Sequence, residues 1–443
     1  MNRKYPMIVA AVAAAVASGY ANAAVPTLAQ ANAPAASLVM AGSSAASAGV
    51  TAAITRDLCG GAANTLTLQS SGGSGNFLAV SCFTAIAIPN LAANTLVTIY
   101  YRTEGGSVVG ALPIVTNKQI KRLNIAGCTN NGTTNTCTVN GVTSQTGTTD
   151  AWTGAVVADT VQLGVTDVEP ALLVANDFPA NYSAAAFGTA TPAQMKALPT
   201  VRLFDQTFGL VVNKNSQTFT SVNLTRESAA NIILGNYSDW ANVPDAASGA
   251  PISSTSSPIT RINREPGSGT RTSTNVFLFG YHCGSAVSMP NPQAGEVLNF
   301  STGEEMNAVN NTPGSIAYAS IDQILNPSNG TKFTNVILAS IDGVAPSNQA
   351  AATGRYGWWF EATLVPETGV AGGSLALSTY LQTNLPKLAN LPSIPDVLAI
   401  PGVAAGNTAS TPLTTNGGAG TATVYVNPYS RAGNSCSVPG EQI

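Results

Sequence analysis

Short apolar runs that end in small polar residues recur along the first half of the chain. Residues 38–40 are apolar and are followed by AGSSA, after which a segment of small residues begins a helix. Residues 96–101, rich in β-branched and aromatic side chains, give way to GGS at 105–107, and TVQLGVTD (160–167) also ends in a polar turn. Strands that each end in such a turn before a helix predict an open α/β sheet.

The middle of the chain contains a long strand and a capped helix. FDQTFGLVVNKN (204–215) reads as a strand on which the chain changes domain. Thr225 is a candidate N-cap, three apolar residues follow at helical spacing, and Gly235 stands where that helix would stop. We expect a surface insertion or small hairpin at 121–153, and a loop at the low-complexity residues 402–423.

The first residues have the pattern of an export signal. A basic start precedes a short apolar run, and Ala-Asn-Ala at 21–23 matches a cleavage site, so residues 1–23 read as a signal peptide. No cysteine lies near that site, so no lipid anchor is indicated, and we expect a periplasmic or secreted protein. No later run is long enough to cross a bilayer.

Charge is scarce in this chain. Charged residues make up 9% of it and the net charge is −3, whereas ordinary domains have roughly 25% charged residues. Folding must therefore depend on apolar burial and backbone hydrogen bonds. The charge balance gives no reason to expect nucleic acid or an anionic membrane as a partner.

Six cysteines in an exported chain suit three disulfides, although six cysteines allow about 15 pairings. We predict Cys59–Cys82, and Cys128–Cys137 across the turn-rich TNNGTTNT. Cys283–Cys436 then follows by elimination. No pair has the spacing of a zinc or redox site, and we expect no metal.

The stretch REPGSGTRT (264–272) has the residues of an anion site. A Gly-rich turn that opens a helix presents backbone N–H groups without partners, at the positive end of the helix dipole. Ser268 and Thr270 add hydroxyl donors, and Arg264 offers a planar pair of N–H groups to two anion oxygens. Taken alone, the motif also fits a solvated loop with a surface arginine.

Four strand-end turns together form a recognisable set. AGSSA (41–45), RTEGGS (102–107), GVTD (164–167) and REPGSGT (264–270) come in this order along the chain. The set resembles the PstS-like family, the periplasmic phosphate-binding proteins of ABC importers, whose last motif is R-x-x-GSGT. LTRESAANIILGNYSDWANV (224–243) and TPGSIAYAS (312–320) are also similar to stretches of that family, so the resemblance runs from about residue 36 to about residue 365.

The resemblance implies a set of phosphate-binding residues. They are Ser44 and the amide of Ala45, Gly106 or Ser107, Asp167, Arg264, Ser268, Gly269 and Thr270. Asp167 would favour an anion that still carries a proton, such as hydrogen phosphate, over sulfate, which has none to donate. The chain departs from the family in having Glu104 next to the second turn. An ionised carboxylate that points into the site would weaken or abolish phosphate binding, but we expect Glu104 to be a solvated loop carboxylate.

The resemblance also implies the architecture and the function. We expect a two-lobed α/β fold of the type II periplasmic-binding-protein kind, with a ligand cleft between the lobes. Lobe 1 would comprise 24–205 and 350–443, and lobe 2 would comprise 206–349. The protein would be a monomer that captures phosphate or a similar oxyanion, without cofactor or covalent chemistry, and could serve an ABC importer.

Two other functions remain open from the sequence. One is a secreted or surface protein that uses this fold for adhesion or matrix contact, which the low charge, the disulfides and Glu104 favour. The other is a secreted hydrolase of phosphate esters, which the lack of metal ligands disfavours. His282, the only histidine, has no G-x-S-x-G motif to serve and reads as a loop or packing residue. Trp358, Trp359, Tyr100 and Tyr101 read as core residues.

Overall fold

The computed structural model describes residues 24–71, 75–130, 135–141, 150–173, 186–281, 283, 289, 296–326, 330–331, 333–386, 397–399, 413–414 and 423–441. The predicted signal peptide (1–23), His282 and nearly all of the predicted loop 402–423 lie outside these residues. In the described part, no helix is both long and apolar enough to span a membrane.

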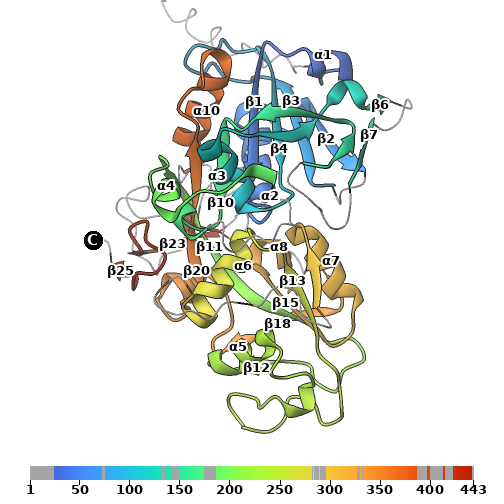
Figure 1. Cartoon of the computed structure of the whole chain (residues 1–443), viewed down its shortest axis with the longest axis vertical. Coiled ribbons are helices and arrows are strands. Elements are labelled where there is room, and N and C mark those ends of the chain that lie inside the picture. Colours follow the sequence, from blue (N-terminus) through green and yellow to red (C-terminus); the bar gives the residue numbers. More distant parts are fainter. Residues whose placement is uncertain are drawn as a thin grey trace, which may run out of the picture.

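The first half of the chain builds a sheet around three parallel strands. Strand β1 (Ala36–Gly42) lies between β4 (Leu96–Arg102) and β10 (Leu163–Thr166) and is parallel to both. Antiparallel strands β3 (Phe77–Phe83) and β2 (Thr65–Ser71) extend the sheet beyond β4. Figure 1 shows these strands in the upper part of the molecule, which we call the upper half.

Helices cover both faces of this sheet, because its strands bury both sets of alternating side chains. Val39 and Ala41 pack with apolar residues of α3 (Ser107–Thr116), and Leu38 and Met40 pack with those of α10 (Gly372–Asn384). Helices α1 (Leu28–Asn32) and α2 (Ser47–Ala53) also belong to the upper half, and α2 continues into a π-helical turn, Ile54–Leu58.

One long strand connects the two parts of the molecule. The first residues of β11 (Val201–Asn213) pair with β20 (Trp359–Pro366), which also pairs with β10. Its last residues pair with β15 (Ser315–Ser320) and β18 (Val336–Leu338). The predicted strand at 204–215 is therefore confirmed, and the residue boundaries of the two lobes remain a prediction.

The lower part of the molecule in Figure 1, which we call the lower half, also contains parallel strands. Strand β13 (Thr260–Arg264) is parallel to β14 (Glu296–Asn299) and to β15. Its helices in Figure 1 are α5 (Arg226–Leu234), α6 (Gly269–Thr274), α7 (Thr302–Asn311) and α8 (Ile321–Ile324). The predicted limits of α5 are confirmed, since the Thr225 hydroxyl accepts a hydrogen bond from Ser228 N and Gly235 has φ 86°.

The segment 121–153 contains the hairpin that the sequence predicts. Strands β6 (Thr129–Asn130) and β7 (Asn135–Asn140) are antiparallel, and β7 also pairs with β8 (Thr153–Gly154). Strands β5 (Gln119–Leu123) and β9 (Val156–Thr160) flank it as an antiparallel pair. The remaining helices and strands are α4 (Pro192–Lys196), α9 (Asn348–Ala352), β12 (Asn223–Leu224), β16 (Leu325–Asn326), β17 (Gly330–Thr331), β19 (Ser340–Ile341), β21 (Val397–Ala399), β22 (Leu413–Thr414), β23 (Thr423–Val426), β24 (Tyr429–Ser430) and β25 (Gly440–Glu441).

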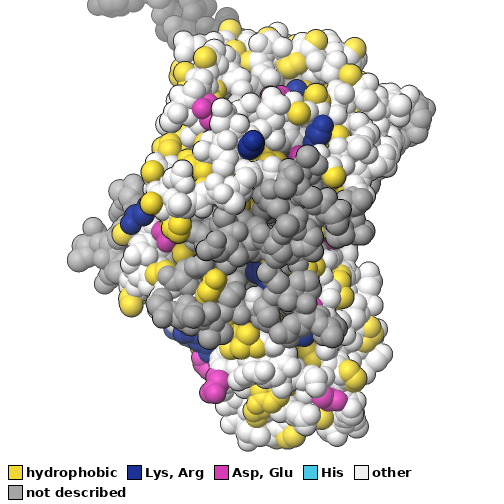
Figure 2. Space-filling view, viewed as in Figure 1, with side chains coloured by type: hydrophobic (Ala, Val, Ile, Leu, Met, Phe, Trp, Pro, Cys, Tyr) yellow, Lys and Arg dark blue, Asp and Glu magenta, His cyan; other side chains and the backbone are white. Residues whose placement is uncertain are grey.

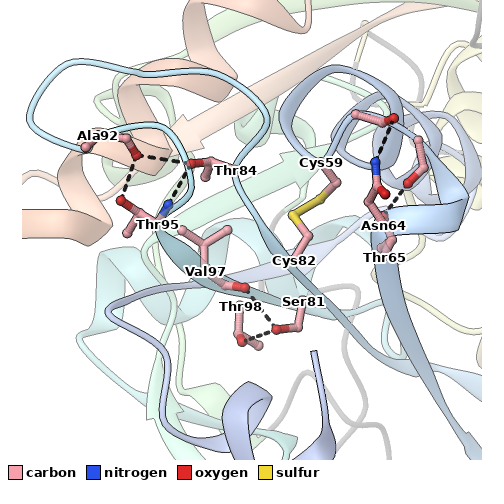
Figure 3. The surroundings of a disulfide bond; sticks show 12 residues. Cys59, Asn64, Thr65, Ser81, Cys82, Thr84, Ala92, Thr95, Val97 and Thr98 are labelled. Carbon is pink, nitrogen blue, oxygen red and sulfur yellow. Dashed lines mark hydrogen bonds between the residues drawn. A yellow bond between two sulfur atoms is a disulfide. The ribbon is translucent and has the colours of Figure 1, made fainter. Parts of the chain in front are cut away.

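All three predicted disulfides are present: Cys59–Cys82, Cys128–Cys137 and Cys283–Cys436. Figure 3 shows the first, which joins the turn after the π-helical segment to β3. Beside it the hydroxyl of Thr98 donates to Ser81 Oγ at 2.9 Å, and Ser81 donates to the carbonyl of Val97 at 3.0 Å. The hydroxyls of Thr98 and Ser81 are thus satisfied within the sheet.

Aromatic side chains predicted for the core are buried. The exposed fractions are 0% for Trp358, 2% for Trp359, and 3% for Tyr100 and Tyr101. Trp358 stacks on Phe277 at a ring-centroid distance of 4.9 Å. Charged side chains are sparse and scattered on the face shown in Figure 2, in agreement with the composition.

Candidate functional site

The four predicted turns follow four strands, and three of those strands lie side by side. Because β4, β1 and β10 are parallel, the turns that hold Ser107, Ser44 and Asp167 leave the same edge of the upper sheet. The fourth turn follows β13 in the lower half and meets this edge, since Val108 N donates to the carbonyl of Gly267 at 3.0 Å. Residues far apart in the sequence therefore share one place.

Hydroxyl groups from three turns converge on the carboxylate of Asp167, which is 2% exposed. Ser43 donates to Oδ1, and Ser107 and Thr270 donate to Oδ2 at 3.2 and 3.4 Å. The backbone N–H of Asp167 donates to Ser107 Oγ at 3.0 Å. Burial raises the pKa of Asp167, while the Ser43 hydroxyl and the Arg264 charge oppose that rise. The result is a buried acidic group surrounded by O–H donors.

Two glycines allow the turns to approach this closely. Gly106 has φ 72°, and a Cβ there would lie 2.9 Å from Ser268 Cα. A Cβ on Gly269 would lie 2.2 Å from the hydroxyl oxygen of Ser107. Of the two residues left open for the second turn, Ser107 therefore supplies a hydroxyl to this cluster, and Gly106 leaves room for the close approach of Ser268.

Arg264 is buried, and the part of the chain that the structure describes offers it no carboxylate partner. Its exposed fraction is 1%, and its guanidinium donates to Asn299 O at 3.3 Å, Phe300 O at 3.1 Å and Thr302 Oγ1 at 2.9 Å. All three acceptors are uncharged. Among the described residues, no carboxylate oxygen lies within 4.0 Å of this guanidinium. The surface-arginine interpretation of REPGSGTRT is wrong.

Ser44 and Arg264 face the same point. The Ser44 hydroxyl lies 3.0 Å from Thr302 Oγ1, which also accepts from Arg264. Thr302 N donates to Ser44 Oγ at 3.1 Å. The carbonyl of Ala45 accepts from Gln323 of α8 at 2.9 Å, so the first turn contacts the lower half twice.

Two residues of the cluster were missed by sequence reasoning. Ser43 precedes the residue chosen in the first turn, and its hydroxyl, rather than that of Ser44, contacts Asp167. Thr302 follows β14, where the stretch NFSTGEE (299–305) repeats the strand-end pattern of the other four turns. The capping box of Ser301 and Glu304 marks the helix start there and was the available signal.

Glu104 does not have the solvated position that we expected. Its side chain is 0% exposed and forms an ion pair with Arg102, which is also paired with Asp150. Arg102 is the last residue of β4, and its guanidinium is buried against the rings of Phe77 and Phe187. Because Glu104 pairs with this guanidinium, its carboxylate is buried as well. Glu104 is thus engaged by Arg102 rather than by the Arg264 guanidinium.

A second buried carboxyl lies below the cluster, on α7. Glu305 is 0% exposed, and burial raises its pKa to about 8, although the positive charge of Arg264 and a hydrogen bond from Tyr318 N oppose the rise. The folded protein therefore keeps a proton on Glu305 that the unfolded chain releases above its ordinary pKa of 4.5. This group makes folding depend on pH.

We expect the free energy of unfolding to fall as pH rises from about 5 to about 8, by up to ~1.4 kcal/mol per pH unit from Glu305 alone. The sign follows because the native state binds this proton more tightly than the unfolded state. Glu305→Gln should remove that part of the slope and be more stable than the wild type at pH 8. Urea unfolding of both proteins at pH 5, 6, 7 and 8 measures the slope of the free energy of unfolding against pH.

Glu227→Gln, on the exposed surface of α5, is the control and should keep the wild-type slope. An unchanged slope in Glu305→Gln would show that Glu305 is not the group that titrates.

No protein-family model and no curated protein matches the sequence significantly. The fold is similar to several solved structures. A periplasmic phosphate-binding protein of high affinity (PfluDING), solved with phosphate, is 13% identical, with 88% of this chain and 90% of that one covered and a TM-score of 0.45. A putative phosphate ABC transporter substrate-binding protein from Clostridium perfringens is 12% identical, with coverages of 78% and 92% and a TM-score of 0.42.

A phosphate-binding protein from Stenotrophomonas maltophilia is also 12% identical, with coverages of 81% and 82% and a TM-score of 0.38. Each of these three solved proteins is described as binding or transporting phosphate.

Proposed function

We propose that the protein binds a small oxyanion, phosphate above all, between its upper and lower halves, without covalent chemistry. The observation that carries the proposal is the Arg264 guanidinium, 1% exposed and without an ion pair among the described residues. A buried charge without a counterion costs several kcal/mol. An anion bound against Arg264 would offset this cost.

The surrounding groups suit an oxyanion. Ser44 and Thr302 place hydroxyls beside Arg264, one from each half, and Ser107 and Thr270 do the same beside Asp167. Hydroxyl hydrogens rotate, so each can turn from its present acceptor to an anion oxygen. Charge-assisted hydrogen bonds contribute roughly 1.5 to 3 kcal/mol each, and an anion that bonds both halves would favour their contact.

Asp167 would give selectivity for an anion that carries a proton. Its carboxylate can accept a proton from hydrogen phosphate, whereas it repels sulfate, which has none to donate. We expect Asp167→Asn to bind phosphate more weakly and to lose about tenfold or more of the preference for phosphate over sulfate. Calorimetric titration of both anions into each protein measures the ratio, and an unchanged ratio would contradict this role.

The proposal is tested by thermal unfolding with phosphate, arsenate, sulfate or no added anion. A ligand bound only by the folded state stabilises it by roughly 2.7 kcal/mol at 100 times its Kd. We expect phosphate and arsenate to raise the melting temperature and sulfate to leave it nearly unchanged. Equal small shifts with all three would indicate a general salt effect and refute the proposed site.

We further propose that the protein is a periplasmic or secreted monomer that serves an ABC importer. The adhesion alternative drew part of its support from Glu104 as an obstacle to anion binding. Because Arg102 holds Glu104, that support falls away.

A further inference from the structure

Glu265 is a buried acid that the proposed anion site does not use. Its exposed fraction is 1%, and neither carboxyl oxygen has a hydrogen-bond partner among the described residues. A buried ionised carboxylate without partners is among the most costly groups in a protein, so the proton stays on such a group. The position of Glu265 determines what that proton controls.

Glu265 lies where the two halves of the molecule touch. It follows Arg264 at the end of β13, in the turn whose Gly267 carbonyl accepts from Val108 N of the upper half. In the same contact, a Cβ on Gly106 would clash with Ser268 Cα. A side chain buried at such a contact becomes hydrated when the halves separate.

Charged groups from both halves surround Glu265. From the upper half come Glu104 and its partner Arg102, and from the lower half come Arg264 and Glu304. Burial raises the pKa of Glu265 well above its ordinary value, and Glu104 adds to the rise, while Arg264 opposes it. Glu304 also raises this pKa, and Arg102 lowers it.

The two neighbouring acids are held by other groups. Glu104 is paired with Arg102, and Glu304 accepts hydrogen bonds from Phe300 N at 2.7 Å and Ser301 N at 3.3 Å. Glu304 also accepts from Asn76 of the upper half at 3.4 Å. Among the described residues, Glu265 is therefore the acid of this contact whose carboxyl oxygens accept no hydrogen bond.

We propose that Glu265 is a proton switch for the contact between the halves: their closing takes up one proton on this carboxyl, and their opening releases it. The inference depends on the proposed function only for its effect on the ligand. The closed form binds the proton more tightly than the open form. Lowering the pH therefore favours the closed form. The ratio of closed to open protein changes up to tenfold per pH unit between the pKa of Glu265 in the open form and its pKa in the closed form.

Small-angle X-ray scattering of the ligand-free protein from pH 5 to pH 9 tests the switch. We expect the radius of gyration of the wild type to increase as pH rises, as the halves separate. Glu265→Gln keeps the shape of the neutral acid and should stay compact throughout. A radius that does not depend on pH in the wild type, or identical profiles in the two proteins, would overturn the proposal.

Two variants make the result specific. Glu305→Gln removes a buried acid of the lower half that hydrogen-bonds within that half, and should keep the wild-type scattering profile. Glu104→Gln removes the negative charge that faces Glu265 from the upper half and should lower the pKa of Glu265 in the closed form. The pH range over which the radius of gyration increases should then be narrower than in the wild type. If Glu265→Gln does not fold, judged by circular dichroism, a Glu104→Gln profile equal to that of the wild type overturns the proposal.

Phosphate titrations of the same proteins connect the switch to the ligand. Ionisation of phosphate itself is common to all the proteins, so the ratio of Kd values between wild type and Glu265→Gln isolates this residue. We expect that ratio to rise with pH. If no protein binds phosphate but the scattering profiles differ as predicted, the proposed function fails and the switch stands.

Discussion

Arg264→Ala is expected to weaken phosphate binding by about 100-fold or more. The guanidinium can offer an anion at least two charge-assisted hydrogen bonds, and each contributes roughly 1.5 to 3 kcal/mol, where ~1.4 kcal/mol corresponds to a tenfold change in Kd. The effect should be in affinity rather than folding, because Arg264 is a buried cation without an ion pair among the described residues, and its removal offsets part of the lost packing. Calorimetric titration with phosphate measures the change.

Arg355→Ala, at an exposed position, is the matched control and should leave the Kd unchanged. The Kd of Arg264→Lys for phosphate should lie between those of the wild type and Arg264→Ala, since an ammonium group keeps the charge but loses the planar pair of donors. Wild-type affinity in Arg264→Ala, in a protein with a normal circular dichroism spectrum, would remove Arg264 from the site.

Loss of the Cys283–Cys436 disulfide should have the largest effect on stability. These cysteines are 153 residues apart, and loop-closure entropy then predicts a stabilisation of about 5 kcal/mol. The bond also holds the C-terminal segment, where Arg431 donates to the carbonyl of Gly357 at 3.1 Å. We expect the double variant Cys283→Ser, Cys436→Ser to unfold at markedly lower urea concentration.

The Cys128–Cys137 disulfide is the matched control. It closes a separation of 9 residues, for which the same relation gives about 2.6 kcal/mol. Its double serine variant should therefore lose roughly half as much stability. Equal losses in the two variants would show that loop closure does not determine what these disulfides contribute.

The fold could be predicted as far as the strands and their turns are concerned, because both are local in sequence. Each of the first three turns follows an apolar strand, and parallel strands bring such turns to one edge. Two disulfides were predicted between cysteines that are near each other in sequence, and the third followed by elimination. The proximity of Arg264 to that edge required the family resemblance, since no local pattern connects residues 44 and 264.

The rest of the site depends on tertiary packing. Ser43 and Ser44 are identical in type and adjacent, so a shift of one residue decides which hydroxyl reaches Asp167. Glu104 carries no sequence signal that it turns to Arg102, because the burial of both side chains is decided by tertiary packing. Thr302 comes from a turn outside the recognised set, although it shares the strand-end pattern.

A crystal structure of the mature protein grown with millimolar phosphate would show whether phosphate occupies the proposed site. We expect one phosphate with oxygens within hydrogen-bond distance of the Arg264 guanidinium and the Ser44 hydroxyl, and with Asp167 as acceptor of the phosphate proton. Density for phosphate elsewhere, or a site in which Arg264 keeps only Asn299, Phe300 and Thr302 as partners at saturating phosphate, would contradict it.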